Sequence, residues 1–415
     1  MKVLCYCESP VIQTGAGRVS QPLIKLMLQL GWELTIVGLN HFGDVPFNKE
    51  EWPCTFINAD IGDYFQPEHA KEAIRAGGYD MLFLSGDINT IDVVMPDALE
   101  ARAKWGFPII SLVVIDADFD MPYLHFLYEV DYPFVYSQFA YDVAVKRLPS
   151  LKEKLQLIPL WFEPDVLYRM EPEKRQRIRQ EILGIESLDT FVILSFNRNQ
   201  RRKDLGRVMY AYHLFHQKYP NSKLYMHAKM KDLGGHLPSQ AHLLGLHPSE
   251  VIFTHESYSV VSGYDRNIVN QIYNAADISI SCSQGEGWGL STSESMAAGI
   301  PFIGPRHTTF LDLIGRNEER GYLAACGGPD LWQIHYSLGE EPRPVTSVTS
   351  MVDKLEHVYL HYKEAMEKAA MARAYAEEHT LKDFQYAWLK VFNYADLCCT
   401  GSPRHHSPLL PSAQK

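Results

Sequence analysis

The chain has 415 residues, which is more than one ordinary hydrophobic core holds and predicts two domains. Hydrophobic residues make up 46% and charged residues 21%, a balance that excludes disordered and fibrous proteins and is typical of a globular one. The formal net charge of -11 argues against a nucleic acid as partner, although a local basic patch would still allow one.

The seven cysteines are scattered, and none has the paired spacing of a zinc site. Reduced thiols in a reducing compartment fit this usage best. The longest apolar runs, such as residues 109–115, are too short to cross a membrane, and residues 1–5 enter a strand without a signal-peptide pattern. We therefore expect a cytoplasmic protein without a membrane span.

The first half of the chain alternates strand and helix patterns. It opens with a buried strand at 2–7, a loop at 8–18 and an amphipathic helix over about 20–30. This alternation implies a parallel sheet with right-handed crossovers, so a complete doubly wound α/β domain is expected. The further strands are predicted at 33–38, 54–58, 81–85, 108–115, 134–137 and 155–159, and the further helices at 68–76, 90–105 and 139–147.

The alternation starts again after a proline-bracketed segment at 159–164, which we interpret as a hinge. Helical patterns then dominate residues 348–398. The expected fold class is α/β with two tandem Rossmann-like domains and a cleft between them. In the second half, helices are predicted at 172–183, 204–219, 237–245 and 266–276, and strands at 191–196, 223–227, 251–254, 278–281, 301–304 and 322–324.

One stretch, residues 281–301, has the composition of an anion site. It runs from a short strand through a loop with glycines at 285, 287 and 289 into a short helix that Gly299 ends. Loop glycines let the backbone approach a ligand closely, and the first amides of a helix can bind a phosphate. Two carboxylates, Glu286 and Glu294, stand with seven residues between them.

The carboxylate of Glu294 has a second interpretation that needs no ligand. Ser291 and Glu294 have the spacing of a capping box, in which the two side chains bond the backbone at a helix start. Glu286 is not explained by that cap, and a carboxylate among three glycines has no evident packing role. The functional interpretation therefore depends on the two glutamates as a pair.

The stretch resembles the signature of retaining glycosyltransferases of family 4, which have the GT-B fold. The resemblance covers about twenty residues: two glutamates at this spacing, a helix of small residues, then Gly299-Ile300-Pro301 and a strand. In that family the second glutamate holds the ribose of a sugar nucleotide, and the first contacts the transferred sugar. The resemblance thus implies Glu294 as ribose ligand and Glu286 as sugar ligand. The implied donor contacts between them come from Gly287, Trp288, Gly289, Leu290 and Ser291.

A basic loop at 196–204 resembles the segment with which family 4 enzymes clamp the donor diphosphate. Arg198 and Lys203 occupy the matching places. Fixed cations at these places stabilise the negative charge that builds up on the leaving diphosphate. Asp204 departs from the family, in which glycine usually follows the lysine, so the register of the lysine stays open by a residue or two. The alternative is a solvated basic loop without a ligand.

The loop after the first strand resembles another donor contact of the family. Gly15 and Gly17 correspond to a glycine pair whose amides face the donor phosphate. The alternative is a pair of glycines that serves only a turn.

Asp116 follows the strand at 108–115, where the family holds a group near the sugar and the acceptor. Asp116-Ala117-Asp118 also fits the metal motif of glycosyltransferases with the other major fold, in which a divalent cation bridges aspartates and diphosphate. The cations and amides of the second domain already supply the partners that a diphosphate needs. We therefore expect no metal and assign Asp116 to the sugar or acceptor, with capping or surface roles for Asp118 and Asp120.

The predicted function is transfer of a sugar, with retention, from a nucleotide diphosphate sugar to a hydroxyl of a glycan or small acceptor, without a cofactor. The alternatives are a sugar-nucleotide-binding pseudoenzyme or scaffold and a GT-B relative such as an epimerase or phosphorylase. Residues 196–199 and the glutamate loop are also similar to glycosyltransferases of large DNA viruses and phages, some of which modify DNA bases. The acidic charge favours glycans or small acceptors.

The resemblance also implies a division of the chain. The predicted domains are an acceptor-binding domain at 1–163, a donor domain at 164–380, a helix at 381–398 that returns to the first domain, and a disordered tail at 399–415. Acceptor specificity is expected in loops of the first domain such as 40–53 and 86–97.

Overall fold

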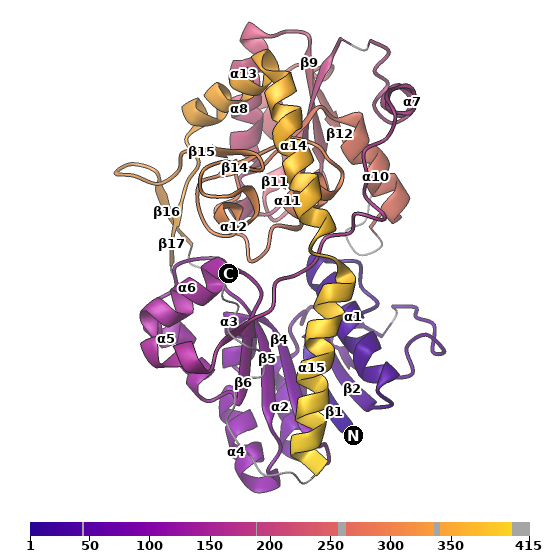
Figure 1. The fold of residues 1–415 in the computed structure, drawn as a ribbon, viewed down its shortest axis with the longest axis vertical. Coiled ribbons are helices and arrows are strands. Elements are labelled where there is room, and N and C mark those ends of the chain that lie inside the picture. The colour runs from indigo at the N-terminus through magenta and orange to yellow at the C-terminus, as the bar shows by residue number, and fades with distance from the viewer. Residues whose placement is uncertain (44, 188, 256–262, 336–340, 401–415) are drawn as a thin grey trace. The chain divides into compact units, whose positions relative to one another are not determined.

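The computed structural model describes residues 1–400 except residues 44, 188, 256–262 and 336–340. The chain forms two compact units. Of the described residues, the first unit comprises those in 1–160, residue 341 and residues 382–400, and the second unit comprises those in 161–335 and 342–381. Each unit has a parallel sheet with helices packed around it (Figure 1), which confirms the predicted α/β fold class. Most of the tail expected to be disordered, from residue 401 on, lies outside the described part of the chain.

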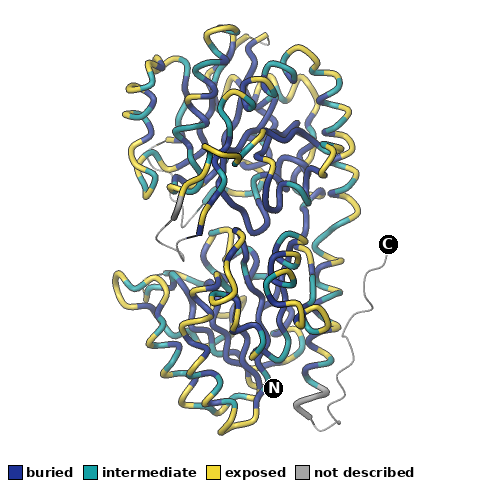
Figure 2. The backbone as a smooth tube through the Cα atoms, turned by 90° about the vertical axis from the view of Figure 1, so that its left-hand side faces the viewer, coloured by how far each residue is buried: buried dark blue, intermediate teal, exposed yellow. Residues whose placement is uncertain are grey.

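The first unit is built on a seven-stranded sheet with the order β3-β2-β1-β4-β5-β6-β7, in which all neighbours are parallel. Its middle strands are buried (Figure 2), since helices cover both faces of a doubly wound sheet. The strands are β1 (Lys2–Glu8), β2 (Glu33–Phe42), β3 (Thr55–Ala59), β4 (Met81–Asp87), β5 (Ile109–Val114), β6 (Tyr132–Val135) and β7 (Gln156–Leu157). The α-helices before residue 160 are α1 (Gly15–Gln29), α2 (Pro67–Ala76), α3 (Ile88–Asp92), α4 (Met95–Trp105), α5 (Met121–Leu124) and α6 (Gln138–Arg147).

Helix α1 begins earlier than predicted. Thr14 is its N-cap, and the Thr14 hydroxyl accepts a hydrogen bond of 3.0 Å from the amide of Gly17. Gly15 and Gly17 therefore lie in the first helical turn and not in the preceding loop. A Cβ on Gly17 would lie 2.1 Å from the carbonyl oxygen of Ile12, so only glycine allows this close approach of helix and loop.

Two other elements of the first unit differ from their predictions. The helix predicted at 90–105 is divided into α3 and α4, because Pro96 occupies the first turn of α4 and favours a new start there. The strand predicted at 134–137 ends at Val135 instead, since Ser137 caps α6 by accepting a hydrogen bond of 3.2 Å from the amide of Ala140.

The last helix, α15 (Leu381–Thr400), packs in the first unit. Trp388 on this helix is fully buried, and its ring centroid lies 4.9 Å from that of Phe134 on β6 and 6.0 Å from that of Phe83 on β4. No helix among the residues that the structure describes is long and apolar enough to span a membrane.

The second unit has a six-stranded parallel sheet with the order β12-β9-β8-β13-β14-β15. Its strands are β8 (Phe191–Phe196), β9 (Ser222–His227), β12 (Val251–Phe253), β13 (Ile278–Ile280), β14 (Phe302–Pro305) and β15 (Tyr322–Ala324). Its helices are α7 (Pro172–Leu183), α8 (Leu205–Lys218), α9 (Leu237–Leu243), α10 (Arg266–Ala275), α11 (Leu290–Ala297), α12 (Phe310–Ile314), α13 (Val348–Leu360) and α14 (Tyr362–Glu377). Two short pairs were not predicted: β10 (Lys231–Asp232) with β11 (Gly235–His236), and β16 (Trp332–His335) with β17 (Glu341–Pro344).

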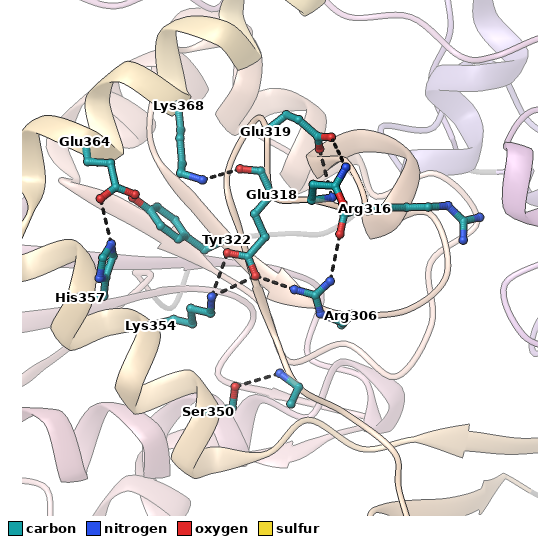
Figure 3. A network of polar contacts seen from close by, with 12 residues as sticks. Arg306, Arg316, Glu318, Glu319, Tyr322, Ser350, Lys354, His357, Glu364 and Lys368 are labelled. Atoms are coloured by element: carbon teal, nitrogen blue, oxygen red, sulfur yellow. Dashed lines mark hydrogen bonds and ion pairs between the residues drawn. The ribbon is translucent and has the colours of Figure 1, made fainter.

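A network of charged side chains ties the loop before β15 to the two helices that follow it (Figure 3). The carboxylate of Glu318 accepts from Lys354 of α13 at 2.8 Å and from Arg306 at 2.5 Å. The backbone carbonyl of the same residue accepts from Lys368 of α14. These contacts hold α13 and α14 against the sheet, and we assign the network to the stability of the unit.

Candidate functional site

The glutamate loop connects β13 to α11 in the second unit. Gly289 is the N-cap of α11 and adopts φ 84° and ψ 64°, a left-handed conformation that favours glycine. No side chain caps the helix start, and Gly299, with φ 66°, follows its end. The loop therefore ends at a helix N-terminus whose first amides have no side-chain cap.

Glu286 lies in the loop with its carboxylate between two cations. Its side chain is 8% exposed, one oxygen pairs with the amine of Lys203, and the other lies 3.5 Å from Arg202 Nη1. Burial alone would raise the pKa of Glu286, but the charges of Lys203 and Arg202 hold it below its usual value. The carboxylate is therefore ionised at neutral pH.

The basic turn Arg201–Lys203, a short 3-10 helix after β8, contacts the loop at several further points. Arg202 donates to the carbonyl of Gly285, and the carbonyl of Arg202 accepts from the amide of Gln284 at 2.7 Å. The side-chain amide of Gln284 donates to Asp204 at 3.1 Å. These bonds fix the turn against the loop, so the cations of the turn and the carboxylate of Glu286 have defined positions.

Glu294 lies on α11 with different partners. Its carboxylate accepts from Arg266 at 2.7 Å and from the hydroxyl of Tyr273 at 3.0 Å, both on α10. Arg266 also pairs with Glu163. The alternative of a capping box with Ser291 is wrong, because Ser291 lies inside the helix and the carboxylate of Glu294 points to α10.

Tyr273 is one end of a stack of three rings. The ring centroid of Phe196 lies 5.2 Å from that of Tyr273 and 4.0 Å from that of His227, with both pairs nearly parallel. His227 is buried, and a hydrogen bond of 3.0 Å joins its Nδ1 to the hydroxyl of Tyr225. Burial lowers the pKa of His227 to about 3, although the nearby Glu294 acts in the opposite direction. The imidazole is thus neutral and serves as a stacking ring.

Arg198, predicted with Lys203 as the diphosphate clamp, points elsewhere. Its guanidinium pairs with Asp232 at 3.1 Å, and its side chain is 44% exposed. Asp204, whose presence put the lysine register in doubt, adopts φ 48° and ψ 50°. This is the left-handed conformation in which glycine is favoured and aspartate is tolerated, so Asp204 takes the backbone shape for which glycine is usual.

The remaining residues of the predicted donor contact belong to the loop and the start of α11. Trp288 is buried, its ring centroid lies 5.8 Å from that of Phe162, and its carbonyl accepts from Thr309 at 3.1 Å. The carbonyl of Ser291 accepts from the Tyr273 hydroxyl at 3.1 Å. The carbonyl of Leu290 accepts a hydrogen bond of 2.9 Å from the Ser293 hydroxyl, and Gly287 is buried in the loop.

Asp116, Gly15 and Gly17 belong to the first unit. Asp116 is buried and lines a small hollow with Asp87, Asn89 and Phe119 at the carboxyl ends of β4 and β5. Ligands of open α/β sheets bind at this edge.

Asp118, the second aspartate of the proposed metal motif, pairs with Lys146 and Arg147 at 3.1 Å each. Asp120 accepts a hydrogen bond of 2.8 Å from the amide of Met121 at the start of α5. Within the described ranges, no group of three or more His, Cys, Asp or Glu residues could hold a metal ion.

Three residues of the site were not predicted from the sequence: Arg202, Arg266 and Tyr273. Each contacts one of the two glutamates across a gap of 21 to 84 residues in the chain. The only sequence signal for them was the basic run that contains Arg202 and the helix pattern that contains the other two.

Comparisons with known proteins bear on the glutamate-loop segment and on the fold. Residues 254–333, which include the glutamate loop, match the family model described as glycosyl transferases group 1. No curated protein matches the chain in sequence. Sucrose-phosphate synthase from Thermosynechococcus elongatus is similar in structure, with a TM-score of 0.73, 15% identity, and coverage of 96% of this chain and 99% of that one.

Two further structures are similar over most of their length. One is a glycosyltransferase from Rickettsia africae ESF-5, with a TM-score of 0.67, 15% identity, and coverage of 95% of this chain and 98% of that one. The other is a UDP-forming α,α-trehalose-phosphate synthase from Burkholderia xenovorans, with a TM-score of 0.64, 9% identity, and coverage of 97% and 99%. The chain therefore has the GT-B fold of glycosyltransferases and carries a group 1 segment, and together these support a glycosyltransferase enzyme.

Proposed function

We propose that the chain is a retaining glycosyltransferase of the family 4 type that uses a nucleotide diphosphate sugar as donor. The observation that carries the proposal is that the two glutamates have different partners. Glu286 faces the cations Lys203 and Arg202, whereas Glu294 is held by Arg266 and Tyr273. The two cations can bind a diphosphate, and the fixed carboxylate of Glu294 can bind the hydroxyls of a ribose.

In the proposed reaction, the bond between the anomeric carbon and the β-phosphate oxygen breaks. The acceptor oxygen bonds to the same face of that carbon, and its proton passes to the leaving phosphate oxygen. No protein nucleophile is required. Lys203 and the amides of residues 287–291 stabilise the leaving diphosphate, Glu286 orients the sugar and Glu294 the ribose.

We assign the acceptor, a glycan or small molecule, to the first unit, with Asp116 and the loops 40–53 and 86–97 as its contacts. The glycine pair Gly15 and Gly17 would face the donor phosphate from the first turn of α1. Because fixed cations and backbone amides stabilise the charge of the diphosphate, the reaction is proposed to need no metal ion. The cysteine usage supports a cytoplasmic location.

The test is thermal unfolding with UDP, GDP and ADP and their sugars, in EDTA and in Mg²⁺. Since one similar structure is that of a UDP-forming enzyme, UDP is tested first. Ligand at 100 times Kd stabilises the folded state by about 2.7 kcal/mol, which gives a measurable shift. We expect one nucleotide to raise the unfolding temperature in EDTA. A shift only with Mg²⁺ would contradict metal independence, and no shift at all would contradict a donor site.

Turnover separates the enzyme from a sugar-nucleotide-binding scaffold. We expect slow hydrolysis of the donor that binds, because water can replace the acceptor. NMR of the first-formed sugar then gives its anomeric configuration, which distinguishes retention from inversion. Binding without any hydrolysis or transfer would favour the scaffold.

A further inference from the structure

The carboxylate of Glu286 occupies a site built for an anion. One oxygen pairs with the amine of Lys203, and the other lies 3.5 Å from Arg202 Nη1. The three side chains are largely buried, at 8% to 24% exposure. A carboxylate and a phosphate present the same kind of oxygen to such a pair of cations. The internal carboxylate is thus a chemical stand-in for a phosphate group.

We infer that Arg202, together with Lys203, forms the diphosphate site, and that Glu286 fills this site until the donor displaces it. This inference rests on the proposed function and assigns the second cation of that site. The donor phosphate then takes the place of the carboxylate, and Glu286 is released to contact the sugar.

Arg202 fits this role better than Arg198, which the sequence pattern favours. The guanidinium of Arg202 is anchored by the Gly285 carbonyl and reaches Glu286, whereas that of Arg198 is engaged by Asp232. The Arg202 side chain is 24% exposed, against 44% for Arg198. A less exposed cation interacts more strongly with an anion, because water screens it less.

The displacement of Glu286 has a consequence for nucleotide affinity. As long as Glu286 is paired with Lys203 and Arg202, it competes with the diphosphate for the same two cations. Removing its charge removes this competitor in every molecule, so the apparent affinity for a nucleoside diphosphate must rise. The same change removes the contact to the sugar, so transfer must slow down.

The first experiment compares Arg202→Gln, Arg201→Gln and Arg198→Gln. Glutamine keeps a hydrogen-bond donor for the Gly285 carbonyl, and Arg201 is an exposed neighbour that controls for net charge. Calorimetry measures Kd for whichever of UDP, GDP and ADP gives the largest thermal shift. We expect Arg202→Gln to weaken this Kd about tenfold or more, and the other two variants to weaken it less.

The corresponding nucleoside monophosphate separates a phosphate contact from general damage. Loss of a cation that binds the β-phosphate should weaken the diphosphate more than the monophosphate. A distorted loop would weaken both equally. Equal losses for Arg202→Gln and Arg201→Gln, or a larger loss for Arg198→Gln, would overturn the assignment.

The second experiment uses Glu286→Gln, and it tests the inference even if Arg202→Gln does not fold. We expect this variant to bind the same diphosphate about three- to tenfold more tightly, with a lower kcat for transfer or donor hydrolysis. Weaker binding by Glu286→Gln would overturn the inference. If the wild type binds none of the three diphosphates, the proposed function fails instead, so the two failures are distinguishable.

Discussion

Arg266 pairs with two carboxylates, and only one of them is assigned to the donor. Glu294 accepts from Arg266 and Tyr273, and Glu163 pairs with the same Arg266. Such a fixed carboxylate can accept hydrogen bonds from two hydroxyls of a ribose with little further loss of conformational entropy, because its position is already set. The shared arginine offers an internal control for the role of Glu294.

Glu294→Gln should therefore weaken nucleoside diphosphate binding by about 10- to 100-fold, since hydrogen bonds to a charged acceptor are lost. Glu163→Gln, which disturbs the same arginine, should weaken it much less. Calorimetry with the nucleotide and with its 2′,3′-dideoxy analogue measures both. If the Glu294→Gln effect is equally large for the analogue, the carboxylate does not bind the ribose.

Burial of His227 gives the protein a specific acid sensitivity. The pKa of His227 is lowered by burial from 6.5 to about 3, so the unfolded chain binds a proton below pH 6.5 that the folded chain does not bind. Stability therefore rises with pH up to about 6.5 and falls as the pH decreases. Because the side chain is buried, the effect of this one group should amount to about 2 kcal/mol between pH 6.5 and 5.

Urea denaturation of wild type and His227→Gln at several pH values measures this contribution. The difference in the free energy of unfolding between the two proteins should be constant above pH 7 and shift in favour of the variant as the pH falls to 5. His242→Gln, which changes an exposed histidine, should follow the wild type. A constant difference at all pH values would show that His227 gains its proton in the folded state as well.

Sequence spacing predicted only part of the site. Glu286, Glu294 and Lys203 were predicted from local sequence patterns, and the structure adds the contact between Lys203 and Glu286. Arg202, Arg266 and Tyr273 were not identified, since their roles come from contacts that only the folded second unit creates. Arg198 had the right spacing but an acidic neighbour in space, Asp232, that the sequence places 34 residues away.

The turn between β8 and α8 is the element that brings the cations to the glutamate loop. It ends at Asp204, whose left-handed conformation allows the chain to enter α8 directly. The Asp204 carboxylate accepts from Arg207 at 2.8 Å and from Gln284 at 3.1 Å. The turn thus depends both on the backbone conformation of Asp204 and on its side chain.

A series at this position separates the two contributions. Asp204→Ala should destabilise the fold by about 1–2 kcal/mol, because a Cβ without a polar group strains the left-handed conformation. Asp204→Gly should relieve the backbone strain and lose only the hydrogen bonds of the side chain. Asp204→Asn should still adopt the left-handed conformation but lose the negative charge. Thermal unfolding and KM for the donor measure the series. Equal stability of the Ala and Gly variants would show that backbone strain does not limit this turn.

Element types were predicted better than element ends. Buried strands such as β1 and β8 were found from their apolar runs, and α7 and β15 agree with their predicted bounds. Errors arose where one polar residue decides the boundary, as with Thr14 at the start of α1 and Ser137 at the start of α6. The short pairs β10–β11 and β16–β17 were missed, since strands of two to four residues carry no measurable periodicity.

At the scale of the whole molecule, the chain distributes its stability over two units that are not consecutive in sequence. The first unit takes its final helix, α15, from the end of the chain. The contacts of Trp388 with Phe83 and Phe134 close the core of that unit. Apart from the glycine pair Gly15 and Gly17, the residues assigned to the diphosphate and the ribose belong to the second unit. Damage to α15 should therefore affect stability and nucleotide binding differently.

Trp388→Ala should destabilise the first unit by about 3–5 kcal/mol, because it removes a fully buried indole from among aromatic rings. Tyr386→Ala, on the exposed face of the same helix, serves as the control and should have a small effect. Calorimetric unfolding with and without the nucleoside diphosphate distinguishes the units, since the ligand should stabilise only the transition of the second one. We expect Kd for the nucleotide to change little in Trp388→Ala at a temperature where the first unit has begun to unfold, because most of the assigned contacts lie in the second unit. A parallel loss of binding and stability would show that the donor site depends on the first unit, and that the two units unfold as one.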